Sequence, residues 1–174
     1  MNGRSWPRLP TEYVYTEKAG KMIRKIVTLG DEALRKNCKP MQKFDLRLNL
    51  LLRDMKETMY KAEGVGLAAP QIGILRRIVV IDVGEGLIEL INPEIQSMEG
   101  EQAGPEGCLS LPGRSGYVVR PQKVTVKAQD RNGKPFTVTG EGLLARALCH
   151  EIDHLDGVLY IDKMDHEITE DSEG

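Results

Sequence analysis

The segment LLARALCHEIDHLDG, residues 143–157, decides how the chain folds around its chemistry. Its apolar residues recur every three to four positions, which predicts an amphipathic helix, and Gly157 supplies the stop signal. Within this helix His150 and His154 stand four residues apart, so their rings share one face and can reach one metal ion. Glu151 follows the first histidine directly, where a carboxylate can act as a general base. The pattern H-E-x-x-H therefore predicts a metal site on a helix.

The faces of this predicted helix separate the site from the core. At about 100° per residue, Leu143 and Ala147 lie on the same narrow stripe as the two histidines, and the neighbouring stripe is rich in leucine. One side should therefore pack into the core while the next presents the histidines to a pocket. Arg146 lies just off the histidine stripe and is expected at the pocket mouth. Cys149 points about 100° or more away from the histidines, so we interpret it as an ordinary helix thiol.

A catalytic ion of this kind needs a third protein ligand and an open position for water. Tyr160 occupies the position from which one class of zinc proteases supplies a third histidine, and it is a poor ligand. Cysteine thiolate is the other good ligand type. We interpret Cys38 as structural, which leaves Cys108, in the segment PEGCLSLPG, as the candidate. The remaining histidine, His166, lies in an acidic tail and is interpreted as a solvated bystander.

The composition indicates one ordinary globular domain. The chain has 174 residues, of which 40% are hydrophobic and 29% charged, enough for a single hydrophobic core. A net charge of -2 gives no electrostatic reason to expect a nucleic-acid binder. No apolar run approaches the roughly 20 residues that span a bilayer. Three cysteines favour a reducing compartment over a disulfide framework, so we expect a cytoplasmic protein.

The two ends of the chain differ from its centre. Residues 1–21 lack the apolar core of a signal peptide and carry acidic residues that transit peptides avoid. Met22 opens a segment typical of a natural start, so we interpret residues 1–21 as an added leader or the result of a misassigned start. Residues 22–164 are the predicted catalytic domain, and residues 165–174 are a predicted acidic tail.

The remaining pattern predicts an α+β fold whose strands lie mainly between two long helices. Asp31 can cap a short helix, and residues 45–63 have the spacing of an amphipathic helix. Buried strands are expected in RRIVVID and LIELINPEI, where Pro93 places the second strand at an edge or a strand end. Asn132-Gly133 predicts a hairpin turn, and VLYI is interpreted as a closing strand.

Three motifs of this sequence resemble those of the peptide deformylase family. G-x-G-x-A-A-x-Q stands at residues 64–71, E-G-C-x-S at residues 106–110 and H-E-x-D-H at residues 150–154. Each motif is complete, and the three stand in the family's order. The resemblance extends from about Met22 to Asp162. It implies an α+β fold with antiparallel or mixed sheets packed around the H-E-x-x-H helix.

The resemblance also implies roles for the motif residues. It implies three metal ligands, Cys108, His150 and His154. Glu151 would be the general acid and base, while Gln71 and the backbone N–H of Leu109 would stabilise an oxyanion. Gly66 would lie close to the bound peptide and pair with it through its backbone. Glu106 and Arg120 would form a supporting pair behind the cysteine loop. The predicted walls of a pocket for a methionine side chain are Val65, Leu143 and Ala147.

The implied activity is hydrolysis of the N-formyl group from the N-terminal formylmethionine of newly made polypeptides, with release of formate, in the bacterial cytoplasm. One divalent ion is implied, Fe2+ in the cell, with Zn2+, Ni2+ or Co2+ as alternatives after purification. The implied partners are N-formylmethionyl nascent peptides and, transiently, the ribosome, though not through the acidic tail. No membrane and no direct nucleic-acid readout are expected.

Two alternatives stay open at the level of sequence. The first is a zincin-type metallopeptidase, against which Tyr160 and the complete E-G-C-L-S motif argue. The second is a domain with a structural zinc and no catalysis, which would need a fourth protein ligand.

Overall fold

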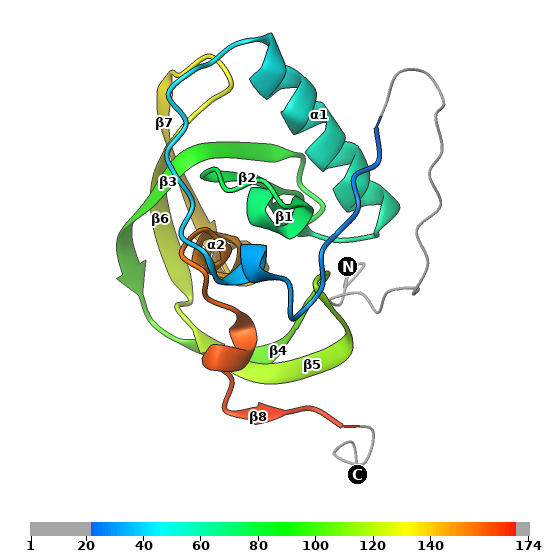
Figure 1. The fold of residues 1–174 in the computed structure, drawn as a ribbon. Helices are drawn as coiled ribbons and strands as arrows, with labels where there is room; N and C mark the ends of the chain where they lie inside the picture. Colours follow the sequence, from blue (N-terminus) through cyan, green and yellow to red (C-terminus); the bar gives the residue numbers. More distant parts are fainter. Residues whose placement is uncertain (1–21, 170–174) are drawn as a thin grey trace.

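The structure of the protein, a computed structural model, describes residues 22–169. The predicted leader and residues 170–174 of the predicted tail lie outside the described residues. In Figure 1, helix α2 (Leu143–Leu155) is seen nearly end-on at the centre, with helix α1 (Leu46–Lys61) above it. Three short 3-10 helices are η1 (Glu32–Arg35), η2 (Ala69–Ile72) and η3 (Tyr160–Asp162). Helices and antiparallel sheets around a central H-E-x-x-H helix confirm the predicted α+β fold.

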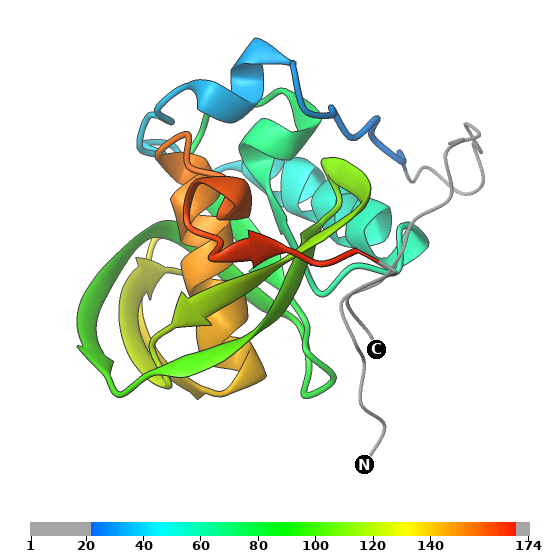
Figure 2. The ribbon, with the colours of Figure 1, turned by 90° about the horizontal axis from the view of Figure 1, so that it is seen from below.

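Two antiparallel sheets flank α2. The larger sheet has the strand order β1-β2-β3-β6-β7. Its strands are β1 (Gly66–Ala68), β2 (Ile78–Ile81), β3 (Ile88–Glu99), β6 (Lys123–Gln129) and β7 (Pro135–Glu141). The smaller sheet has the order β4-β5-β8, with β4 (Gln102–Cys108), β5 (Leu111–Arg120) and β8 (His166–Glu167). Figure 2 shows β8 beside the hairpin formed by β4 and β5.

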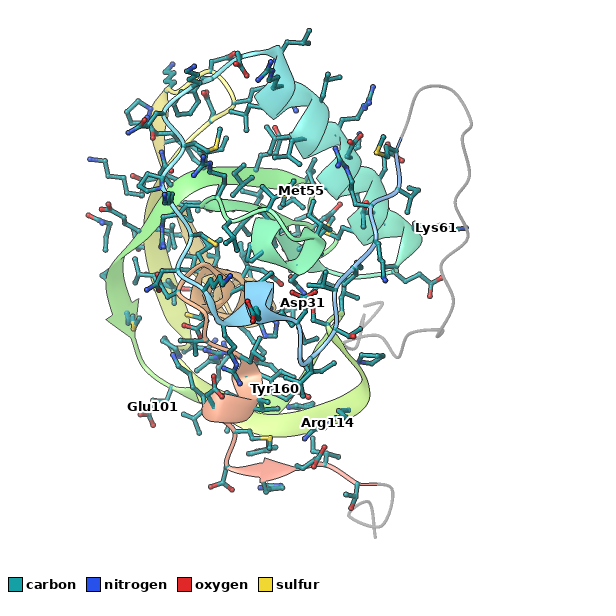
Figure 3. The ribbon with its side chains drawn as sticks, in the orientation of Figure 1. Asp31, Met55, Lys61, Glu101, Arg114 and Tyr160 are labelled. Atoms are coloured by element: carbon teal, nitrogen blue, oxygen red, sulfur yellow. The ribbon has the colours of Figure 1, made fainter. Side chains whose placement is uncertain are left out.

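Helix α1 covers one face of the larger sheet. Asp45 caps it, because its carboxylate accepts a hydrogen bond from the backbone N–H of Leu48 at 3.2 Å. The apolar stripe of the helix includes Leu52, Met55 and Met59, all fully buried. Figure 3 shows Met55 on the side of α1 that faces the sheet. Burial of each such side chain stabilises the fold by about 1.5–3 kcal/mol.

Strand β2 is buried on both faces and joins two core clusters. Ile78 and Val80 pack in the cluster under α1, whereas Val79 and Ile81 pack in the cluster under α2. This alternation follows from the two-residue period of a strand. The larger sheet therefore separates the two long helices and fixes α2 against its inner face.

The expectation for Pro93 is wrong. Strand β3 lies in the middle of the larger sheet, neither at an edge nor ending at the proline. Pro93 falls where the register of β3 with β6 shifts, between Ile91 and Glu94. A proline at such an irregularity removes no ladder hydrogen bond. The preceding Asn92 has a positive φ of 51°, and its side chain bonds Met41 and Gln129 across the irregularity.

The expected closing strand at VLYI is also wrong, because its first two residues form no regular element and its last two, Tyr160 and Ile161, lie in the 3-10 helix η3. The carboxylate of Asp162 accepts a hydrogen bond from the backbone N–H of Leu159 at 2.9 Å and closes the turn. Arg35 donates to the same carboxylate. Leu159 and Tyr160 then enter the third core cluster, under the β4–β5 hairpin.

The predicted hairpin is confirmed: β6 and β7 pair antiparallel on either side of the turn that contains Asn132 and Gly133. Asp31 caps η1 as expected. No helix between residues 22 and 169 combines the length and the apolar character needed to cross a bilayer.

Candidate active site

Three metal-ligating atoms converge where α2 meets the β4–β5 hairpin. Cys108 ends β4, directly before the two-residue turn Leu109–Ser110, while His150 and His154 lie on α2. The Sγ of Cys108 lies 3.4 Å from Nε2 of His154, which lies 3.2 Å from Nε2 of His150. All three residues are buried. Within residues 22–169 this is the one group of three or more such ligands close enough to hold a single ion.

The chemistry of this cluster fits a divalent transition metal. A thiolate with two imidazoles is a donor set that zinc and iron accept. Nδ1 of His150 lies 2.7 Å from Oε1 of Glu106, which leaves Nε2 for the ion. Burial and the neighbouring His150 hold the pKa of His154 well below its usual value, so this imidazole is neutral and able to ligate.

Glu151 lies beside the cluster with the properties of a general base. Its side chain is buried, and burial raises its pKa from an ordinary 4.5 to about 7. A carboxyl group with a pKa near neutrality can both take and return a proton at neutral pH. Its Oε2 is buried and has no hydrogen-bond partner among the described residues. A buried oxygen without a protein partner is suited to a water or substrate atom.

The two glycines of the first motif lie against the other two motifs. A Cβ added to Gly64 would lie 2.8 Å from Cδ1 of Leu109, and one added to Gly66 would lie 2.5 Å from Oε1 of Glu151. Neither position can hold a larger side chain without displacing its neighbour. Gly66 begins β1, at the edge of the larger sheet. The first motif therefore brings a residue without a side chain, at the edge of the sheet, against Glu151.

Gln71 brings a side-chain amide to the ligand cluster. It lies in η2 and is buried. Its Oε1 accepts a hydrogen bond from the backbone N–H of Ala68 at 2.9 Å. Its Nε2 lies 3.5 Å from Sγ of Cys108 and 3.2 Å from Oγ of Ser110. The amide N–H groups therefore point toward the ligand cluster, as an oxyanion donor requires.

A buried ionic network holds the cysteine loop against α2. Glu106 is fully buried and accepts hydrogen bonds from Nε and Nη2 of Arg120 at 2.8 and 2.9 Å. Arg120 also donates to Asp153 at 2.7 Å. Although burial by itself would raise the pKa of Glu106, hydrogen bonds from Arg120 and His150 hold it well below its usual value. The ionised Glu106 thus orients the His150 ring.

The expected position of Arg146 is wrong. Instead of lying at a pocket mouth, its side chain is buried and donates to Glu106 at 2.7 Å and to the backbone carbonyl of Val118 at 3.0 Å. A buried carboxylate such as Glu106 is stabilised by charged donors, and here two guanidinium groups and His150 surround it. The sequence did contain evidence for this position: Arg146 stands four residues before His150, so both lie on one face of the helix.

The remaining candidate residues lie in the core or at the start of α2. Val65 and Ala147 are buried, the latter in the core cluster under the larger sheet. Leu143 is half-buried at the start of α2 and lines a surface pocket beside β7. Cys149 is buried in the same core cluster as Ala147 and is not among the converging ligand atoms. The three predicted pocket walls remain predictions.

His166 is exposed, as a solvated residue would be, but it also makes contacts that the sequence did not predict. Its ring stacks on Tyr117 with centroids 5.3 Å apart, and it pairs with Tyr117 in the β5–β8 ladder. The predicted tail therefore contributes its first residues to the smaller sheet.

Comparison with known proteins agrees with this site. Residues 23–170 match the polypeptide deformylase family. The chain belongs to the peptide deformylase family. It is 61% identical over 149 residues to a peptide deformylase of Caldicellulosiruptor bescii, covering 86% of this chain and 90% of that protein. A peptide deformylase of Caldanaerobacter subterraneus is 63% identical over 142 residues, covering 82% of this chain and 89% of that protein.

Solved structures of the same family share the fold. The crystal structure of a Legionella pneumophila peptide deformylase aligns with a TM-score of 0.80 at 56% identity, covering 82% of this chain and 86% of the other. A Synechococcus elongatus peptide deformylase in complex with actinonin aligns with a TM-score of 0.80 at 41% identity, covering 90% and 88%.

Proposed function

We propose that this deformylase removes the formyl group from the N-terminal formylmethionine of newly made polypeptides, releasing formate and a free amine. One observation carries the proposal: Glu151, whose pKa is raised to about 7 by burial, keeps a buried oxygen without a protein partner beside three converging ligand atoms. Cys108, His150 and His154 would hold one divalent ion. When bound, the ion supplies a Lewis acid that activates water and polarises a carbonyl group.

The residues around this cluster account for the movement of protons and charge. Glu151 takes a proton from the attacking water as the new C–O bond forms at the formyl carbon. When the C–N bond breaks, the same carboxyl group returns the proton to the departing amine nitrogen. Nε2 of Gln71 and the backbone N–H of Leu109 donate to the formyl oxygen as it becomes negative. Each such donor typically accounts for a rate factor on the order of 100 to 1000.

We propose that the substrate binds at the edge of the larger sheet. Gly66 starts the edge strand β1, whose outer backbone groups can pair with an extended peptide. Val65, Leu143 and Ala147 are the proposed walls for the methionine side chain. A pocket that selects by shape and apolar contact discriminates modestly, by roughly 10- to 200-fold per methylene group.

A comparison of two peptides tests the proposal against its alternatives. The enzyme should release formate from formyl-Met-Ala-Ser in a metal-dependent manner and leave acetyl-Met-Ala-Ser intact. A zincin-type peptidase would instead cut an internal peptide bond of either substrate. A structural zinc domain would turn over neither peptide and would need a fourth ligand; no fourth such residue joins the cluster within residues 22–169.

We propose Fe2+ as the ion used in the cell, with Zn2+, Ni2+ or Co2+ as replacements after purification. Affinity alone favours zinc over ferrous iron, so the cellular metal depends on availability. Metal analysis and turnover of protein prepared without oxygen, compared with protein reloaded with each ion, would identify the metal that supports turnover. The proposed location is the bacterial cytoplasm, with transient association with the ribosome through a surface other than the acidic tail.

A further inference from the structure

Ser110 contacts the amide that the proposed mechanism uses. It is the second residue of the turn between β4 and β5 and is fully buried. Its Oγ accepts a hydrogen bond from Nε2 of Gln71 at 3.2 Å. A buried hydroxyl that accepts from one catalytic side chain has a geometry suited to orient it.

The backbones of Gln71 and Ser110 both form hydrogen bonds with the segment of residues 27–29. The N–H of Val27 donates to the carbonyl of Gln71 at 2.8 Å, and the N–H of Leu29 donates to the carbonyl of Ser110 at 2.9 Å. This segment thus holds the Gln71 helix and the Ser110 turn at a fixed separation. The backbone therefore fixes the distance across which the side chains of Gln71 and Ser110 form their hydrogen bond.

The hydrogen bonds of Gln71 permit only one orientation of its amide. Its Oε1 accepts from the N–H of Ala68, so a flipped amide would set two donors against each other. A flip would also place the amide oxygen, in place of an N–H donor, beside Sγ of Cys108. In the observed orientation one N–H is directed to Ser110, and the other is left for Cys108 or for an oxygen that gains charge.

We propose that Ser110 is a positioning residue that fixes the amide of Gln71, so that its second N–H stays aimed at the formyl oxygen in the transition state. This inference rests on the proposed role of Gln71 in deformylation. Without the Ser110 hydroxyl the amide keeps its bond to Ala68 through Oε1 but loses the contact that holds its Nε2 end, so the direction of the second N–H is less well fixed. The expected result is a fall in kcat by about 10-fold, the value of one ordinary hydrogen bond, with KM nearly unchanged.

A double-mutant cycle on the metal-loaded enzyme tests this inference. Ser110→Ala, Gln71→Ala and the double variant would be compared for kcat and KM on formyl-Met-Ala-Ser, at measured metal content. If Ser110 acts through Gln71, Ser110→Ala lowers kcat in the wild-type background and has no further effect in the Gln71→Ala background. Equal losses in both backgrounds, or no loss in either, would overturn the proposal.

Thr58→Ala is the matched control. Thr58 is also a fully buried hydroxyl, and it accepts from the backbone N–H of Arg24 at 2.9 Å on helix α1, away from the site. Its loss should lower the melting temperature without changing kcat per bound metal. If Ser110→Ala behaves in the same way, its role is structural and the inference fails.

A spectroscopic measurement covers a variant that folds but loses its metal. In metal-free protein the side-chain amide protons of Gln71, assigned by their disappearance in Gln71→Ala, should give two separated NMR signals. Ser110→Ala should shift and broaden them, whereas Thr58→Ala should not. Unchanged signals would overturn the proposal. Absence of turnover by the wild-type enzyme would count against the proposed function instead, and these NMR signals would still test the contact.

Discussion

Gly66 and Glu151 occupy adjoining space: a Cβ on the glycine would lie 2.5 Å from Oε1 of the carboxylate. Real Cβ atoms do not approach another atom so closely, so a side chain at this position of strand β1 would have to displace the Glu151 side chain. A requirement for glycine at this position is usually explained by backbone conformation or by a ligand. Here the side chain of Glu151, on helix α2, adds a steric reason for glycine.

We expect Gly66→Ala to displace the Glu151 carboxylate while leaving the metal ligands in place. Turnover should fall by at least about 100-fold, the lower end of the contribution of a positioned acid and base. Metal content and kcat measured on the same preparation would check this. Gly104→Ala is the control, because its Cβ would meet only the Arg146 guanidinium, at an ordinary 3.5 Å. Equal effects of the two substitutions would contradict the steric explanation.

The stability of the metal-free protein should depend on pH through Glu151. Burial raises its pKa from 4.5 to about 7. Between these values the folded state keeps a proton that the unfolded chain has released, so the free energy of unfolding falls as pH rises through this window. The slope for one group is at most roughly 1.4 kcal/mol per pH unit.

Glu151→Gln removes this titration and should also lose nearly all turnover while still binding metal. Urea denaturation with a chelator, at several pH values from about 5 to 7, should show the wild type losing its stability relative to the variant as pH rises. A constant difference between the two proteins across this range would mean that the carboxyl group is already ionised at its lower end.

The two cysteines near the active-site helix should behave oppositely. Cys108→Ser should weaken metal binding or change the preferred ion, because a hydroxyl is a harder and far less acidic ligand. Cys149→Ser should leave metal content and rate nearly intact, since this thiol packs in the core, where burial raises its pKa to about 11. Metal analysis of both variants checks the pair. Loss of metal from the Cys149 variant would show that the assigned helix face is wrong.

Local patterns were sufficient to predict the elements that carry the chemistry. The spacing of His150 and His154 fixes their shared face within one helix, and the periodicity of residues 45–63 predicted α1, observed at Leu46–Lys61. Each prediction depends on neighbours within a few residues. The third ligand, Cys108, followed only by elimination and from the motif.

The features that were missed depend on partners distant in sequence. The β4–β5 hairpin contains proline and glycine residues that interrupt any alternating pattern of apolar and polar residues. Its two strands are therefore defined by their pairing with each other and not by the sequence of either strand. Arg146 meets Glu106 across 40 residues of sequence, so helical periodicity showed its face but not its partner. VLYI was wrongly predicted as a strand because its apolar residues do not show that the carboxylate of Asp162 closes a turn on the backbone N–H of Leu159. The Arg35 side chain that donates to this carboxylate lies 127 residues away in sequence.

Arg146 should contribute strongly to stability. Arg146→Met would leave Glu106 buried with one guanidinium fewer, and breaking a buried ion pair costs about 3–5 kcal/mol. Arg146→Lys, which retains the charge, should cost less. Arg131→Met provides the contrast, because its pair with Glu89 is more exposed and should be worth at most about 1 kcal/mol. Urea denaturation of the metal-free variants gives these values, and a mild effect of Arg146→Met would show that Arg120 alone is sufficient for Glu106.

The start of the C-terminal tail is joined to strand β5. The N–H of Ile168 donates to the carbonyl of Ser115 at 2.9 Å, and Arg114 pairs with Glu167 at 2.7 Å. The ring of His166 stacks on Tyr117. All of these contacts lie at the surface, where each contributes little. The tail therefore covers the edge of β5.

Removal of residues from Asp165 onward should therefore lower the melting temperature slightly and leave turnover on formylated peptides unchanged. It should also leave ribosome association unchanged, because RNA binding needs clustered lysine or arginine. From Asp165 onward the chain has five acidic residues and no lysine or arginine, so the tail is repelled by RNA. A chain that ends at Thr169 keeps β8 and should retain the melting temperature of the full protein. Co-sedimentation with ribosomes at low and moderate salt tests the second half of the prediction: salt-sensitive binding by the full chain that disappears in the Asp165 truncation would show that the tail docks after all, against its charge.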